Sequence, residues 1–144
     1  MLKNAKWITA PIDMGVAAST FKKSIDLKSE IKSAKLYVTA MGNYAAYIDK
    51  KRVSDAVLTP GFTSFNNRIL YQEYDITDIL RNNSVIEIGV GQGWAVGYIG
   101  FGRRSNHYFA DYTSVIARLY VVYADGSEES VVTDTDWEVY TNPV

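Results

Sequence analysis

The sequence predicts an all-β domain, a jelly-roll-like β-sandwich of antiparallel strands with one short helical turn. Three observations lead to this prediction. Apolar and polar side chains alternate in several segments, turn-forming residues separate these segments at roughly ten-residue spacing, and almost no segment has helical periodicity. A chain of 144 residues suits a single domain over 1–144, because this length buries most of its apolar surface without disulfides or metals.

The first half of the chain follows a short extended segment that includes Trp7. We expect its strands at residues 19–27, 31–41, 44–48, 51–57 and 68–74. The first would be an edge strand, with Lys22 and Lys23 discouraging pairing with another chain. Asp49-Lys50 is a candidate two-residue hairpin, although it lacks the glycine that such turns favour. The segment 59–67 is expected to be a long loop.

The centre of the chain is the most informative stretch. It begins with a helical turn over 75–80, whose first N–H groups we expect to donate hydrogen bonds to Asp75. Ile86, Ile88 and Val90 then alternate along a strand with one buried face. A glycine-rich loop follows, where regular structure is expected to end, and it is the first place to look for function.

The C-terminal part predicts a hairpin and one more strand. Residues 111–123 are expected to form the longest strand. Asp125-Gly126 is a strong turn signal, because this pair accepts the positive backbone angles of a tight reversal. The return strand is expected at 128–133, and a further strand at 135–140.

Composition excludes several classes of function. The chain has no cysteine, which rules out disulfides, thiolate metal sites and cysteine nucleophiles. Its formal net charge is -1, whereas nucleic-acid binders carry a clear basic excess, so no nucleic-acid partner is expected. No apolar run is long enough to span a bilayer and no secretory signal is present, so no membrane partner is expected either.

Three patterns that could indicate catalysis or a cofactor have better explanations. The glycines at 91–97 follow a strand, but their spacing is longer than a dinucleotide fingerprint and no βαβ pattern surrounds them. His107 is the only histidine and lacks a nucleophile elbow, so we interpret it as a loop residue. Asp134 and Asp136 resemble a glycosidase carboxylate pair, but turn formation explains them better.

The aromatic residues suggest a sugar-binding surface. Eleven tyrosines and three tryptophans are present, and flat amphipathic rings beside amides suit a pyranose; the same rings also fill protein cores. In and beside the glycine-rich loop lies Phe101, with further rings and polar groups around it. The candidate carbohydrate-binding residues are Gln92, Trp94, Tyr98, Asn106, His107 and Tyr108.

Five segments together resemble a known family. They are residues 34–42, 47–53, 58–65, 68–80 and 91–94. They resemble the N-terminal β-sandwich of bacterial α-L-rhamnosidases, glycoside hydrolase family 78, over about residues 7 to 137. The turn at 75–77 alone also resembles the sugar-binding domains of β-galactosidases and β-glucuronidases.

The resemblance implies an accessory domain without catalytic residues of its own. The family cleaves terminal α-L-rhamnose with inversion, and its acid and base carboxylates lie in a separate helical-barrel domain, which becomes the expected partner. A rhamnose-containing carbohydrate is the implied ligand. The alternatives are a purely structural scaffold domain and a self-contained enzyme.

Two departures from the family pattern bear on metal binding and turn structure. Asp49-Lys50 stands where the family usually has Asn-Gly. Gln92 and Ala95 stand where the family favours an aspartate and a tyrosine around Gly93-Trp94. Some relatives bind rhamnose with calcium, and an aspartate is a hard oxygen ligand for that ion. No cofactor is therefore expected, and calcium is not favoured.

Overall fold

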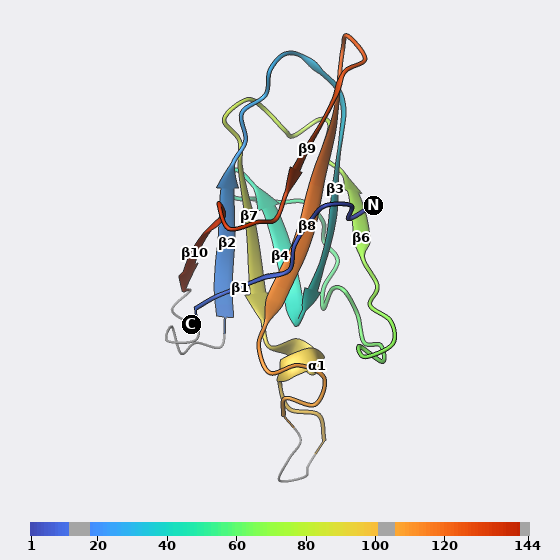
Figure 1. The fold of residues 1–144 in the computed structure, drawn as a ribbon, viewed down its shortest axis with the longest axis vertical. Coiled ribbons are helices and arrows are strands. Elements are labelled where there is room, and N and C mark those ends of the chain that lie inside the picture. Colours follow the sequence, from blue (N-terminus) through green and yellow to red (C-terminus); the bar gives the residue numbers. More distant parts are fainter. Residues whose placement is uncertain (12–17, 101–105, 142–144) are drawn as a thin grey trace.

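Two antiparallel five-stranded sheets pack face to face in the computed structural model, which describes residues 1–11, 18–100 and 106–141 (Figure 1). The first sheet contains, in spatial order, β1 (Ile8–Thr9), β8 (Ser114–Tyr123), β3 (Ile31–Met41) and β6 (Gln72–Asp75), with β9 (Glu128–Val132) also paired to β8. The second contains β10 (Glu138–Thr141), β2 (Ala18–Ser24), β7 (Val85–Gly91), β4 (Asn43–Ile48) and β5 (Lys51–Arg52). The predicted all-β sandwich is confirmed.

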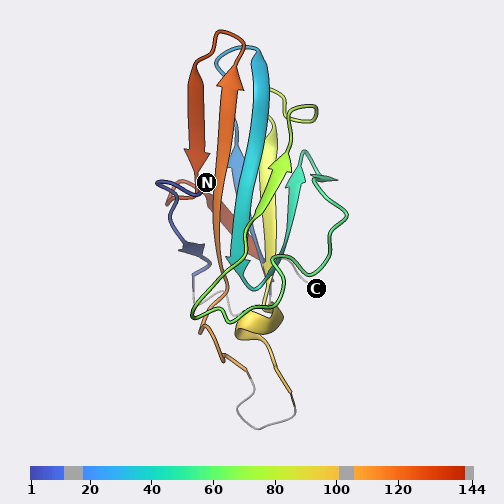
Figure 2. The same ribbon diagram turned by 90° about the vertical axis from the view of Figure 1, so that its right-hand side faces the viewer.

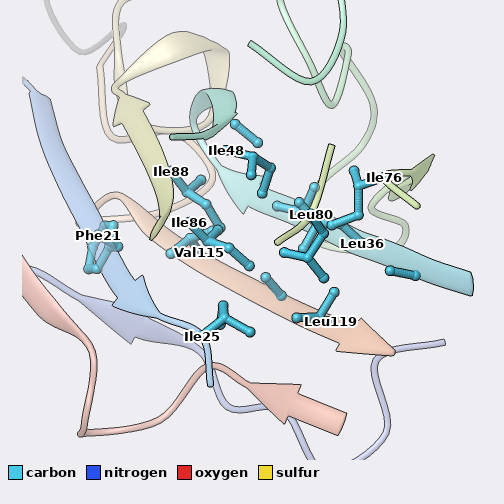
Figure 3. Packing of buried hydrophobic residues seen from close by; sticks show 14 of the residues in the cluster. Phe21, Ile25, Leu36, Ile48, Ile76, Leu80, Ile86, Ile88, Val115 and Leu119 are labelled. Carbon is cyan, nitrogen blue, oxygen red and sulfur yellow. The ribbon is translucent and has the colours of Figure 1, made fainter. Parts of the chain in front are cut away.

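The hydrophobic core fills the space between the two sheets. Figure 3 shows Phe21, Ile86 and Ile88 of the second sheet pointing toward Leu36 and Leu119 of the first. All five side chains are at most 2% exposed. The alternation of apolar residues in β3, β7 and β8 therefore predicted the buried face of each strand correctly. Each of these fully buried side chains contributes about 1.5–3 kcal/mol to the stability of the fold.

The Asp49-Lys50 hairpin forms without glycine. Both residues have positive φ, +50° and +68°, and they connect β4 to β5. The Asp49 carboxylate accepts hydrogen bonds from the Val85 main-chain nitrogen (2.8 Å) and the Ser84 hydroxyl (2.7 Å). These bonds lower the pKa of Asp49, that from Val85 most strongly. They also tie the strained turn to the start of β7, which offsets the missing glycine.

The predicted helical turn is present as one hydrogen-bonded turn. The Ile76 carbonyl accepts bonds from the nitrogens of Ile79 (3.1 Å) and Leu80 (2.9 Å). Asp75 Oδ1 accepts a bond from the Thr77 nitrogen (3.0 Å), as expected of a capping carboxylate. Ile76 and Leu80 are buried in the main core, so the turn closes one side of the sandwich.

Some strand predictions were wrong in position or extent. β2 is not an edge strand, because β10 pairs with its residues 19–22, which places Lys22 opposite Glu138 and not at an open edge. β5 ends at Arg52, and β6 begins only at Gln72. β3, with 11 residues, is longer than β8, with 10. Within the described ranges, no helix is long and apolar enough to cross a lipid bilayer.

Candidate functional site

The glycine-rich segment after β7 forms a short helix, α1 (Gly93–Val96), at one end of the sandwich. Figures 1 and 2 show α1 beyond the strand ends, followed by the loop that leads toward β8. Gly93 has a φ of +51°, and a Cβ there would lie 2.7 Å from the main-chain nitrogen of Asn43. Glycine is required at this position because a side chain would be strained and would clash. The sequence did not predict this helix.

A second, smaller hydrophobic cluster supports α1. Its members are the buried Phe65, Ala95 and Val96 and the partly buried Met41, Ile69, Trp94, Phe109 and Ala110. The returning chain is hydrogen-bonded to the helix, from the His107 nitrogen to the Val96 carbonyl (2.8 Å) and from the Ala110 nitrogen to the Ala95 carbonyl (3.1 Å). Packing and main-chain bonds together fix this end of the sandwich.

Four aromatic residues form a connected row at this end, which we call the end-loop aromatic cluster: Phe62, Trp94, Tyr108 and Phe109. The Phe62 ring lies 6.0 Å from Trp94 and 6.3 Å from Phe109, both edge to face. The Phe109 ring lies 4.8 Å from Tyr108. Phe62 and Tyr108 are 58% and 68% exposed, while Trp94 is half-buried. The row therefore presents aromatic surface to solvent from a packed base.

Only part of the predicted site is brought together. Trp94 and Tyr108 belong to the end-loop aromatic cluster. Gln92 and Tyr98 are exposed and Asn106 is half-buried, and no hydrogen bond or ring contact between described residues joins these three to the cluster. Phe101, which the sequence also suggested, lies outside the described residues.

His107 serves the loop itself. It has a φ of +55°, and its Nδ1 lies 2.9 Å from the main-chain carbonyl oxygen of Asp111. This contact agrees with its interpretation as a loop histidine rather than as a member of a catalytic triad.

The Asp134–Asp136 pair has a local structural role. Asp134 Oδ1 accepts a hydrogen bond from the Asp136 main-chain nitrogen at 2.9 Å. Side chain to backbone bonding two residues ahead is the usual turn pattern for aspartate. The turn interpretation of this pair is confirmed.

Sequence reasoning missed the phenylalanines of the end-loop aromatic cluster and its base. Phe62 and Phe65 lie in the loop that precedes β6, and their rings pack at 6.3 Å. The sequence feature that could have identified them is a pair of phenylalanines three residues apart in a loop rich in polar and turn-forming residues. Such rings need a partner, and the partner here is α1 with the segment after it.

The family model described as the α-L-rhamnosidase N-terminal domain matches residues 29–144. An α-L-rhamnosidase of Streptomyces avermitilis is 34% identical over 117 residues, which cover 80% of this chain and 11% of that protein. One from Formosa agariphila is 32% identical over 150 residues, covering 95% of this chain and 16% of that protein. The chain thus spans only a small part of these relatives.

Solved structures show the same fold. The native α-L-rhamnosidase of Aspergillus terreus matches with a TM-score of 0.93 and 32% identity, over 99% of this chain and 17% of that one. The Streptomyces avermitilis α-L-rhamnosidase complexed with L-rhamnose matches with a TM-score of 0.81 and 32% identity, over 89% and 12%. A Pleurotus ostreatus lectin in complex with GalNAc, 20% identical over 96% and 35%, shares the fold with a TM-score of 0.62.

Proposed function

Because the chain belongs to the family of α-L-rhamnosidase N-terminal domains, we propose that it is the non-catalytic, sugar-binding accessory domain of an α-L-rhamnosidase. The parent enzyme would hydrolyse terminal α-L-rhamnose from glycans or glycosides. Its acid and base carboxylates would lie in the helical-barrel domain that the sequence resemblance implies, which makes that domain the partner of this one.

The end-loop aromatic cluster is the observation that supports this proposal best. Sugar rings present C–H faces that stack on aromatic side chains, and hydroxyl edges that need hydrogen-bonding groups. Phe62 and Tyr108 expose most of their rings beside the half-buried Trp94. The smaller hydrophobic cluster beneath them fixes their positions, so little conformational entropy is lost when a ligand binds.

L-rhamnose is the ligand we assign to this surface, because one of the structural relatives is an α-L-rhamnosidase complexed with that sugar. The contact area for one monosaccharide is small. We therefore expect a dissociation constant on the order of 1 mM, since few ligand atoms contribute free energy.

A scaffold function is the competing proposal, and the half-buried state of Trp94 favours it. In that case the ring only closes the end of the sandwich, where it contacts Phe62 and the smaller hydrophobic cluster. The two functions differ in what loss of the Trp94 ring does to sugar binding.

A calorimetric titration of the domain with L-rhamnose separates them. Wild type should release or absorb heat at millimolar sugar, Trp94→Ala should not, and Trp7→Ala should bind as wild type does. Trp7 is a suitable control because it is also partly exposed, at 44%, and it precedes β1, which is an edge strand of the first sheet. Wild type without a heat signal, in the presence or absence of calcium, would leave the scaffold function standing.

An assay with an aryl α-L-rhamnoside tests the non-catalytic part of the proposal. We expect no turnover by the purified chain. Turnover that follows the protein through purification and disappears in Asp134→Ala or Asp136→Ala would show instead that the chain is an enzyme.

A further inference from the structure

The outer face of the second sheet contains a hollow of about 530 Å³, which we call the sheet trough. It lies on the opposite side of this sheet from the main core. Its floor contains Ala45, Gly89 and Gly91, and its rim includes Tyr47 and Tyr140. The volume falls within the range of about 300–1,000 Å³ that is usual for small-molecule sites.

Strand register explains why this face is hollow. Gly89 of β7 lies opposite Thr20 of β2 on one side and Ala45 of β4 on the other. Because side chains alternate across a sheet, these three lie in one row on the outer face. Gly91, two residues along, belongs to the same face. Larger side chains border this row: Tyr140 stands at one end of it, because it pairs with Thr20, and Tyr47 stands in the neighbouring row, because it pairs with Glu87.

Neither position 89 nor position 91 requires glycine for its backbone conformation or for its packing. Neither has positive φ. A Cβ on Gly91 would meet no atom within 4 Å, and one on Gly89 would come no closer than 3.8 Å, to the Thr20 hydroxyl. Glycine inside a strand weakens it, and one common reason for its presence is close approach by a ligand. The fold would therefore tolerate side chains at these two positions, and the space above the floor is left open.

A charged group stands beside this open floor. Glu87 is 4% exposed, and its Oε1 accepts hydrogen bonds from Lys50 Nζ (2.7 Å) and the Tyr140 hydroxyl (2.6 Å). Burial favours a higher pKa for Glu87, but these two bonds outweigh it and the pKa lies below its ordinary value. The group is thus a carboxylate at neutral pH.

The second carboxylate oxygen of Glu87 remains available. No hydrogen bond to Oε2 is present among the described residues, and no fully buried side-chain polar atom in that part of the chain lacks a partner. Oε2 is therefore not completely buried, and Glu87 is one of the residues that line the sheet trough. Lys50 is mostly exposed, so its ammonium group has donors left for a ligand as well.

We propose that the sheet trough is a second carbohydrate-binding site, separate from the end-loop aromatic cluster, which takes two or more units of a neutral oligosaccharide. Paired hydroxyls of the sugar donate to Glu87 Oε2 and accept from Lys50 Nζ. The rings of Tyr47 and Tyr140 contact its C–H surfaces, and Gly89 and Gly91 let the sugar ring approach the backbone.

The chemistry of the sheet trough selects this class of ligand. A phosphate or carboxylate group gains no net attraction there, because the Glu87 carboxylate already neutralises Lys50. A purely apolar ligand would desolvate Glu87 Oε2 and the remaining Lys50 donors without offering them hydrogen bonds, which is costly. A neutral polyol offers both donors and acceptors, and so satisfies the two charged groups together.

The test is a nuclear magnetic resonance titration of the isotope-labelled domain with neutral tetrasaccharides of α-linked L-rhamnose, β-linked D-glucose and β-linked D-galactose. At least one should shift the amide resonances of Thr20, Gly89 and Gly91. Gly91→Val fills the floor, and it should weaken that binding at least tenfold. Glu87→Gln should weaken it several-fold without filling space.

Trp94→Ala separates this site from the proposed L-rhamnose site. The variant should retain the shifts at Gly89 and Gly91, because the sheet trough does not use Trp94. In wild type, shifts at Gly89 and Gly91 with no response to L-rhamnose at the end-loop aromatic cluster would mean that only the L-rhamnose site is wrong. No shift in the sheet trough with any of the three sugars, or unchanged binding by Gly91→Val, would overturn the present proposal.

Discussion

In two neighbouring regions of the molecule, glycine is present for opposite physical reasons. Gly93 begins α1 with positive φ, and a side chain there would collide with the backbone of Asn43. Gly89 and Gly91 lie in a regular strand, where a side chain would meet only ordinary contacts or open space. The first glycine is needed to build the end of the sandwich. The other two leave a hollow on its outer face, which is what a ligand-binding surface needs.

The largest expected effect is on Gly93. Gly93→Val would place a β-branched residue at φ +51° and force its Cβ against Asn43. Strain and overpacking together should lower the free energy of unfolding by about 3–5 kcal/mol. Denaturant unfolding measures this loss. A cost below about 1 kcal/mol would mean that the helix and the adjacent strand separate easily, and that the end of the sandwich is loosely packed.

Trp94→Ala should have an intermediate effect. A fully buried tryptophan costs about 3–5 kcal/mol when truncated, and a half-buried one should cost about 2 kcal/mol. Denaturant unfolding of this variant beside Trp7→Ala gives the comparison. A loss as large as that of a core residue would assign Trp94 to packing alone and weaken the case for an L-rhamnose surface.

A smaller effect is expected from Glu87 in the sheet trough. Its folded-state pKa is lowered, so its stabilising contribution is present above the unfolded-state pKa and disappears as pH falls through the folded-state value. As pH falls below the ordinary glutamate pKa of about 4.3, wild type should therefore lose stability more steeply than Glu87→Gln does. Identical pH profiles for the two proteins would show that the bonds from Lys50 and Tyr140 do not persist in solution.

The sequence predicted well those features that depend on neighbouring residues. β3 was predicted over its observed residues, and the buried faces of β7 and β8 follow directly from alternation. The Asp125-Gly126 turn forms as expected, with φ +86° at Gly126. Local periodicity and turn chemistry are sufficient here, because each strand turns one apolar face toward the same core.

Features that depend on distant pairing were missed. β2 was expected at an edge, yet Phe21 pairs with Val139, more than a hundred residues further along the chain. α1 has only four residues, and it is supported by contacts with β3, the loop before β6 and the segment after itself. The sheet trough depends on the register of several strands, which no local pattern encodes.

The candidate site was predicted in part for the same reason. Trp94 and Tyr108 were identified because they lie near one another in sequence and share a glycine-rich context. Phe62 joins them only through the fold. The prediction of Gln92, Tyr98 and Asn106 rests on their proximity in the sequence, and the structure does not place them in the end-loop aromatic cluster. Their part in sugar binding remains a prediction.

The most direct test of the contrast between the two regions is the free energy of unfolding of Gly91→Val, measured by denaturant titration beside Gly93→Val. A side chain at position 91 meets open space, and valine suits a strand better than glycine does. Gly91→Val should therefore be as stable as wild type, or more stable by up to about 1 kcal/mol. A loss approaching that of Gly93→Val would contradict it, because the glycine would then serve the fold and not an open binding surface.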